Sequence, residues 1–178
     1  MNFRTVFGTL LTALCVISAV AKAGETTTST ATAAARFEAV KKLAGDWVER
    51  GKDGTPTDKL VSSIRVTAGG TVVEETLFPG TDHEMVTMYH RDGDDLVLTH
   101  YCTLGNQPRM RAEPGGAADR IAFAFVGATN LKSDDDHHMR RATLNLADPD
   151  RYRSEWVPCK EGGPCGKVAF DLVRRPRK

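Results

Sequence analysis

The feature that most constrains the fold is a long succession of short, alternating, β-branched segments separated by tight turn signals. Residues 60–67 and 71–78 are joined by Ala68-Gly69-Gly70, and residues 83–91 and 96–102 are joined by a turn around Asp92-Gly93. An Asp-Gly pair between alternating segments is among the strongest short-range signals for a β-hairpin. This part of the chain therefore predicts consecutive antiparallel hairpins.

The same organisation continues to the C-terminus, with strand-like segments at 121–126, 139–146, 151–157 and 167–174. Ahead of the first strand, residues 36–43 carry apolar side chains at helical spacing, and Gly45 marks a stop. Successive hairpins without a long crossover favour a barrel, because closure removes exposed sheet edges. We expect an all-β, antiparallel up-and-down barrel of about eight to ten strands, preceded by one short helix.

The N-terminus has the three zones of a secretory signal peptide. Arg4 supplies a positive charge, residues 6–20 are apolar or small, and Ala21-Lys22-Ala23 offers small residues where a signal peptidase reads them. The apolar stretch, about 15 residues, is shorter than the roughly 20 that a membrane-spanning helix needs. We expect cleavage after Ala23, a flexible leader over 24–35, a single barrel domain over 36–178, and a periplasmic or extracellular location.

The charge balance excludes a general polyanion binder. Loss of Arg4 and Lys22 with the signal peptide leaves 22 basic against 23 acidic residues, so the mature chain carries a net charge of −1. Nucleic-acid-binding domains carry a clear basic excess, and nucleic acid is therefore not an expected partner. The basic run from Arg174 to Lys178 is interpreted as a solvated chain end.

Three cysteines remain after processing. Cys159 and Cys165 are separated by Lys-Glu-Gly-Gly-Pro, in which the glycines and the proline let the chain double back. Export to an oxidising compartment makes a disulfide between them the expected outcome. A metal clip is the alternative, although one cysteine pair without a nearby histidine is a weak zinc signal. Cys102 is left without a partner and is expected to be buried.

The second hairpin carries the most informative mixture of side chains. If its turn has an even number of residues, alternate side chains of both strands share one face. That face combines imidazoles, a hydroxyl and a thiol with apolar groups, which is more typical of a pocket wall than of a plain core. Its members are His83, Met85, Thr87, Tyr89, Leu96, Leu98, His100 and Cys102.

Two polar segments follow. The Gly-Asn and Gln-Pro pairs within 104–110 predict a tight connection, which would hold Asn106 and Arg109 near a barrel rim. There an amide and a guanidinium suit a carboxylate or another polar head group, unless the amides simply bond their own backbone. Residues 134–138, Asp-Asp-Asp-His-His, do not match an EF-hand and are expected to form a solvated acidic loop. His138 would turn inward if it alternates with Ala142 and Leu144.

Catalytic motifs are missing from the sequence: it has no Gly-x-Ser-x-Gly elbow, no His-Glu-x-x-His and no phosphate-binding glycine loop. Glu74 and Glu75 are adjacent on a strand and face apart, so one of them points inward and needs a partner. His100 and Cys102 have the spacing of a base and a nucleophile on one face, but a buried thiol is the simpler interpretation. Enzyme activity stays open, and a binding protein is the favoured reading.

Two phrases of the sequence resemble a known group. Leu43-Ala-Gly-Asp-Trp47 after a short helix is similar to the opening of calycin barrels, in which a Gly-x-Trp marks the first strand and the Trp closes the barrel floor. Residues 98–102 (Leu-Thr-His-Tyr-Cys) and 105–110 (Gly-Asn-Gln-Pro-Arg-Met) look like exported bacterial proteins related to lipocalins, fatty-acid-binding proteins and haem-binding nitrobindins. The resemblance implies a barrel with a central cavity and a small ligand, with His100, Asn106 and His138 at the pocket or its mouth. In nitrobindin-like proteins one axial histidine on a late strand binds haem, and His138 is its counterpart here.

These features predict an exported, lipocalin-like barrel that binds a small amphipathic molecule. The first alternative is a haem- or metal-binding barrel that uses His100 and His138, since imidazole, thiol and thioether groups suit copper, zinc or haem iron. The second is a hydrolase or isomerase with a histidine in the cavity. The sequence names neither a cofactor nor an oligomeric state. The expected ligand-binding residues are His83, Met85, His100, Cys102, Asn106, Arg109 and His138.

Overall fold

A computed structural model of the protein describes residue 1 and residues 31–133, 135–160, 163–164 and 166–176. One helix, α1 (Ala33–Lys41), precedes the strands, and a short 3-10 turn, η1 (Ala68–Gly70), lies between two of them. The strands are β1 (Gly45–Arg50), β2 (Pro56–Thr67), β3 (Val72–Leu77), β4 (Met85–Asp92), β5 (Asp95–Tyr101), β6 (Gln107–Ala112), β7 (Arg120–Thr129), β8 (His138–Asp148), β9 (Arg151–Lys160), β10 (Gly163–Pro164) and β11 (Val168–Arg174).

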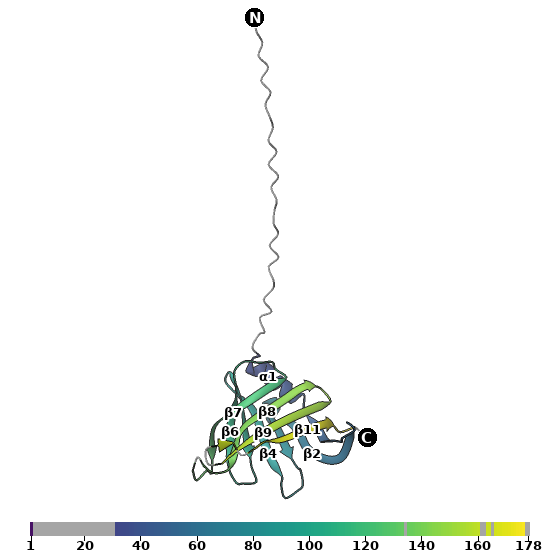
Figure 1. Ribbon diagram of the computed structural model, residues 1–178, viewed down its shortest axis with the longest axis vertical. Coiled ribbons are helices and arrows are strands. Elements are labelled where there is room, and N and C mark those ends of the chain that lie inside the picture. The colour runs from purple at the N-terminus through teal and green to yellow at the C-terminus, as the bar shows by residue number, and fades with distance from the viewer. Residues whose placement is uncertain (2–30, 134, 161–162, 165, 177–178) are drawn as a thin grey trace.

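The strands form a closed antiparallel barrel, as predicted. Each of the strands from β1 to β9 pairs with the next in the chain, β9 pairs with β11, and β11 pairs with β1 to complete the circle. Ten of the described strands make the wall, while β10 pairs only with the end of β9. The β11–β1 pairing removes the two edges that an open sheet of the described strands would have, which is the physical advantage of this architecture. Figure 1 shows the tilted strands of the wall with α1 at one end.

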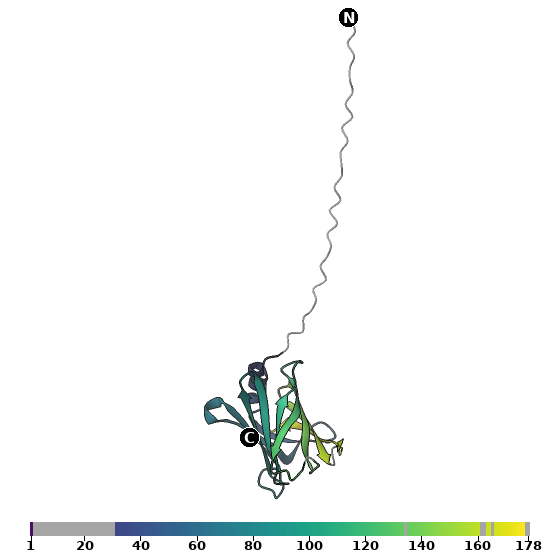
Figure 2. The ribbon, with the colours of Figure 1, turned by 90° about the vertical axis from the view of Figure 1, so that its left-hand side faces the viewer.

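Helix α1 covers that end of the barrel, in agreement between two perpendicular views (Figures 1 and 2). It begins at Ala33, three residues earlier than predicted, because the Thr32 hydroxyl accepts a 3.2 Å hydrogen bond from the Ala35 amide and caps the first turn. Phe37 and Val40 are buried against the barrel. The helix is anchored by Arg36, whose guanidinium donates to the carbonyl oxygens of Glu113 and Gly115. None of the described helices is long and apolar enough to cross a membrane.

The first strand is fixed by Trp47, which is fully buried and donates from Nε1 to the Leu43 carbonyl at 2.8 Å. The guanidinium of Arg174 lies 4.4 Å from the centre of the Trp47 ring and donates to the carbonyl oxygens of Ala44 and Lys42. Interpreting the basic run as a solvated chain end was therefore wrong for Arg174, which joins the end of β11 to the start of β1. The closed wall and the buried Trp47 are consistent with the calycin resemblance.

Large side chains fill much of the interior. They form one contiguous cluster that runs from the helix into the barrel. A cluster of this kind excludes water and holds its members in fixed rotamers. Its largest fully buried members are Trp47, Tyr89, Tyr152, Phe123, Met110 and the leucines 96, 98, 144 and 172, with Leu172 at 2 % exposure.

Candidate functional site

The end of the barrel opposite α1, here called the open end, holds most of the predicted ligand-binding residues. Antiparallel strands place the end of β5 and the starts of β6 and β8 together at this end. His100 is the last residue but one of β5, Asn106 immediately precedes β6, and His138 opens β8. All three side chains are buried.

The parity argument for the second hairpin is confirmed. Asp92 pairs with Asp95 across a two-residue turn, so Thr87 lies opposite His100 and Tyr89 lies opposite Leu98 on the inner face. The Thr87 hydroxyl and His100 Nδ1 share a hydrogen bond of 2.9 Å. Burial lowers the pKa of His100 to about 4, because the charged imidazolium loses its hydration. His100 is therefore a neutral ring at neutral pH.

Three other residues of that predicted face lie elsewhere or only at its margin. His83 is exposed, because the loop before β4 continues to Glu84, where the carboxylate of Glu84 accepts a hydrogen bond from the Gly80 amide. Met85 is the first residue of β4 and is half-buried. Cys102 is half-buried rather than buried, since β5 ends at Tyr101 and the Cys102 amide begins a turn by donating to the Asn106 carbonyl.

The prediction of a tight connection over 104–110 was partly wrong, because Gln107 to Ala112 form strand β6. Pro108 is tolerated there because the described pairing of β5 with β6 stops at Thr99–Arg109, so the missing N–H is not needed on that side. The turn itself is held by Asn130, which has a left-handed backbone (φ 58°) and donates from Nδ2 to Gly105 O and Gln107 Oε1. The side-chain amides of Gln107 and Asn130 therefore bond groups of the turn itself, whereas the Asn106 amide bonds a residue of another segment.

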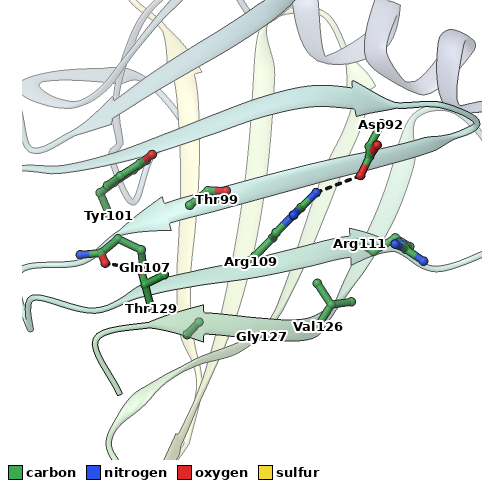
Figure 3. Close-up of a pocket in the computed structure, with 10 residues that line it drawn as sticks. Asp92, Thr99, Tyr101, Gln107, Arg109, Arg111, Val126, Gly127 and Thr129 are labelled. Atoms are coloured by element: carbon green, nitrogen blue, oxygen red, sulfur yellow. Dashed lines mark hydrogen bonds and ion pairs between the residues drawn. The ribbon is translucent and has the colours of Figure 1, made fainter. Parts of the chain in front are cut away.

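Arg109 lies on the outside of the barrel, not in a pocket with Asn106. Its guanidinium forms a 2.9 Å ion pair with Asp92 across a hollow of about 730 Å³ on the outer face of β5, β6 and β7 (Figure 3). Two further polar pairs lie in or beside this hollow: Gln107 with Thr129, and Arg111 with Asp95. An incoming carboxylate would have to displace an existing partner there.

At the open end β7 and β8 separate. Their described register ends at Ala124–Arg141, although β7 continues to Thr129 and β8 begins at His138. This gap, here called the seam, is filled by the Phe125 and His138 rings, whose centres are 4.7 Å apart. Asn106 bridges the seam by donating from Nδ2 to the His137 carbonyl at 2.9 Å.

His138 is buried, as expected if it turns inward, but it does not alternate with Ala142. A bulge between Met139 and Arg141 inserts an extra residue, so His138 pairs with Cys159 while Ala142 pairs with Trp156. Cys159 and Trp156 are three residues apart on β9 and therefore face opposite sides of the sheet. His138 is buried in the seam, where its ring contacts that of Phe125. Asp134 lies outside the described residues, Asp135 is exposed, and Asp136 is half-buried, with its carboxylate accepting hydrogen bonds from the Lys132 and Ser133 amides.

A hollow of about 370 Å³ adjoins the seam. That volume is within the usual range of small-molecule pockets. The rim includes Phe125, with the Arg140 guanidinium 5.2 Å from its ring centre, and Cys159, the register partner of His138. The lining residues are Ala124, Phe125, Arg140, Arg141, Val157, Pro158, Cys159 and Gly163.

Buried polar atoms without a hydrogen-bond partner gather at the open end. Of the six such atoms in the described structure, four are His100 Nε2, Trp156 Nε1, Asn106 Oδ1 and His138 Nε2, and the other two are Arg36 Nε on α1 and Ser154 Oγ on β9. The rings of His100 and Trp156 are in contact, with centres 4.9 Å apart, and Asn106 is joined to the residue before His138. Each such atom costs about 1–3 kcal/mol when it is left dry, so their concentration at one end calls for a partner.

Substitutions of Trp156 and Trp47 test whether the unpartnered N–H of Trp156 destabilises the folded protein. In protein refolded from urea, Trp47→Phe should lower the free energy of unfolding by about 3 kcal/mol, because it leaves the Leu43 carbonyl unpaired and opens a cavity. Trp156→Phe should cost only about 1 kcal/mol, since loss of an unpartnered N–H offsets the lost packing. Urea titration of the two variants measures the difference, and equal losses would contradict it.

Glu75 is a second buried polar group, and the sequence predicted its inward direction but not its partners. Glu75 points inward, as the alternation of Glu74 and Glu75 requires, and it is 1 % exposed. Its Oε1 accepts hydrogen bonds from Ser62 (2.8 Å) and Tyr152 (2.6 Å), and its Oε2 accepts one from Tyr89 (2.8 Å). Burial raises the pKa of Glu75 against the opposing effect of these donors, and burial with the nearby carboxyl raises the pKa of both tyrosines.

The residues present do not fit haem. His138 Nδ1 lies 2.6 Å from the Asp136 carbonyl, which can only accept, so Nδ1 carries the proton and Nε2 of the neutral ring is a lone pair suited to an axial ligand. A macrocycle also needs an open cavity beside that ligand, whereas the rings of Phe125 and Trp156 and the neighbouring core occupy this part of the barrel. Among the described residues, no three His, Cys, Asp or Glu side chains are placed to share a metal ion.

The predicted Cys159–Cys165 bridge remains a prediction, because Cys165 lies outside the described residues. Cys159 and Cys102 are free thiols in the structure, and Cys159 is buried. Comparison with protein-family models and with curated proteins finds no match to this chain.

Proposed function

We propose that the protein is an exported small-molecule-binding barrel whose ligand occupies the open end. The observation that carries this proposal is the concentration of unpartnered buried polar atoms there, from His100, Trp156, Asn106 and His138. A ligand inserted at the seam would supply the missing partners and would also cover the Phe125 ring. The signal-peptide pattern of residues 1–23 supports a role in the periplasm or outside the cell.

Native mass spectrometry of the protein recovered from an exporting host tests both halves of the proposal. The mature chain should begin at Gly24, and it should carry a bound molecule of defined mass. His138→Phe should lose that molecule, whereas His83→Phe should retain it, because His83 is exposed in the loop before β4. An empty barrel that also takes up nothing from a fluorescent-lipid and fragment panel would refute ligand binding. A chain that keeps residues 1–23 would refute export.

A metal ion held by His138 is the second candidate, and it is favoured by one observation. The Nδ1 donation to the Asp136 carbonyl is the arrangement in which metal-ligating histidines are usually oriented. Elemental analysis of the same preparation decides between the candidates. A stoichiometric transition metal that disappears in His138→Phe would replace the small-molecule proposal, and a haem Soret band would do the same.

A further inference from the structure

The hollow on the outer face of β5, β6 and β7, here called the outer hollow, has a low floor. Thr99, Arg109 and Gly127 form one row across the three strands in the described register. Gly127 has no side chain, and a Cβ atom placed there would meet nothing within 4 Å. Arg109 leans out of the row toward Asp92 (Figure 3). The row therefore leaves a volume of about 730 Å³, which is within the usual range of small-molecule sites.

Apolar surface borders this row on both outer strands. Tyr101 at the end of β5 is 48 % exposed, and Val126 on β7 is 51 % exposed. Both side chains line the outer hollow. Neighbouring strands lie about 4.8 Å apart, so the two strands that carry these side chains are on the order of 10 Å apart across β6. An elongated ligand would therefore contact both of them.

Two ion pairs bring polar groups to the outer hollow without a net charge. Arg109 pairs with Asp92 at 2.9 Å, and Arg111 pairs with Asp95 at 3.2 Å. A single hydrogen bond, from Nη2 to Asp92 Oδ2, joins the first pair. A guanidinium has five N–H donors and a carboxylate accepts several hydrogen bonds, so this pair presents donors and acceptors together to a further partner. Because each guanidinium has its own carboxylate, the outer hollow favours neither an anion nor a cation.

From this arrangement we infer that the outer hollow is a binding site for uncharged oligosaccharides. A hydroxyl group both donates and accepts, so neighbouring hydroxyls of a sugar bond the guanidinium of Arg109 and the carboxylate of Asp92 together. The C–H face of a sugar ring packs on the exposed ring of Tyr101, and a second ring covers Val126. This site is separate from the seam, and the inference does not rest on the proposed function.

Two other occupants suit the lining less well. A carboxylate or phosphate would have to separate Arg109 from Asp92. A second copy of the chain would cover the apolar side chains, but it would also take both exposed ion pairs out of water, and this costs free energy unless every charge is hydrogen-bonded. The hydroxyls of a sugar replace the water molecules and keep these charges bonded.

Titration of the exported protein with cellohexaose, maltohexaose and N-acetylchitohexaose tests the inference, with oligogalacturonate as the charged probe. At least one uncharged probe should bind, with a Kd of about 1 mM or tighter in calorimetry, as expected of a partly solvated site. Its affinity should change less than about twofold between 0.05 and 0.5 M salt, because no charge is screened. Oligogalacturonate should bind at least about tenfold more weakly.

Variants of the lining assign the binding to the outer hollow. Tyr101→Ala should weaken binding of the uncharged probe about tenfold, whereas Tyr101→Phe should keep it, because the ring face remains. Arg109→Leu should weaken it about fivefold or more by removing the donors beside Asp92. Val66→Ala and Arg65→Leu are the matched controls, since they change an exposed valine and an exposed ion pair on β2, and both should bind as the wild type does.

Four results would each overturn the inference. These are no binding of any uncharged probe, an affinity unchanged in both Tyr101→Ala and Arg109→Leu, equal or tighter binding of oligogalacturonate, and self-association that Tyr101→Ala abolishes in sedimentation while no sugar binds. The last result would make this face an interface between copies of the chain. An empty barrel in native mass spectrometry removes the proposed function alone, because the outer hollow lies on the other side of the wall.

Discussion

Replacing Glu75 with leucine should lower the free energy of unfolding by about 4 kcal/mol, one of the two largest effects expected for a single substitution in this chain. Leucine has a similar volume, so little of the loss comes from a cavity. The loss arises because Ser62, Tyr89 and Tyr152 all donate to the Glu75 carboxyl and would each be left with a buried, unpaired hydroxyl. Urea titration at neutral pH measures the change.

The neighbouring residue provides the control. Glu74 lies on the opposite face of β3 in a 2.7 Å pair with Arg65, whose side chain is 67 % exposed. Surface pairs of this kind contribute about 0–1 kcal/mol, so Glu74→Leu should have little effect. Comparable losses from Glu74→Leu and Glu75→Leu would show that the interior cluster is not formed as described.

The pH dependence of Glu75 has a definite sign. Burial raises its pKa above the ordinary value of 4.5 that it regains on unfolding. Its favourable contribution is therefore complete below about pH 4.5 and is lost as the pH rises through the raised folded-state pKa. Glu75→Gln cannot titrate, and its stability relative to the wild type should increase as the pH rises above 4.5.

Local signals in the sequence were sufficient for most of the barrel wall. Asp92-Gly93 fixed a two-residue turn, and that turn alone determined that Thr87 and His100 face inward together. The β6 strand was missed because Pro108 in a central strand normally argues against a strand. Here it lies beyond the last described β5–β6 pair and next to the bulge at Arg109–Met110, where a ladder hydrogen bond is not required.

The candidate site was less predictable because it depends on contacts between distant segments. Alternation required one of Glu74 and Glu75 to face inward, but nothing local indicates that Tyr152, 77 residues away, supplies a donor. The bulge between Met139 and Arg141 shifts His138 out of phase with Ala142, and a single inserted residue leaves no compositional trace. The position of His138 in the seam could therefore be found only from the register of the paired strands.

Wild-type protein should lose about 3 kcal/mol of stability through His100 alone as the pH falls from 6.5 to 4. Burial lowers the pKa of His100 from 6.5 to about 4, so the unfolded chain binds a proton in this window while the folded protein does not. The contribution is complete above pH 6.5 and is lost as the pH falls toward the folded-state value. His100→Asn, which cannot titrate and retains a group beside the Thr87 hydroxyl, should show a flatter profile.

Glu75 and His100 change the free energy of unfolding in opposite directions over part of this pH range, so the measurement has to separate their contributions. Between about pH 4.5 and 6.5, Glu75 favours the folded state at lower pH while His100 favours it at higher pH. Urea titrations of His100→Asn should therefore be made in both the wild-type and the Glu75→Gln background, with the exposed His83→Asn as the control. The His100-dependent slope should be the same in both backgrounds and absent from the control. A slope that vanishes in Glu75→Gln would mean that the two groups, which flank Thr87 in the register of β3, β4 and β5, titrate as one coupled pair.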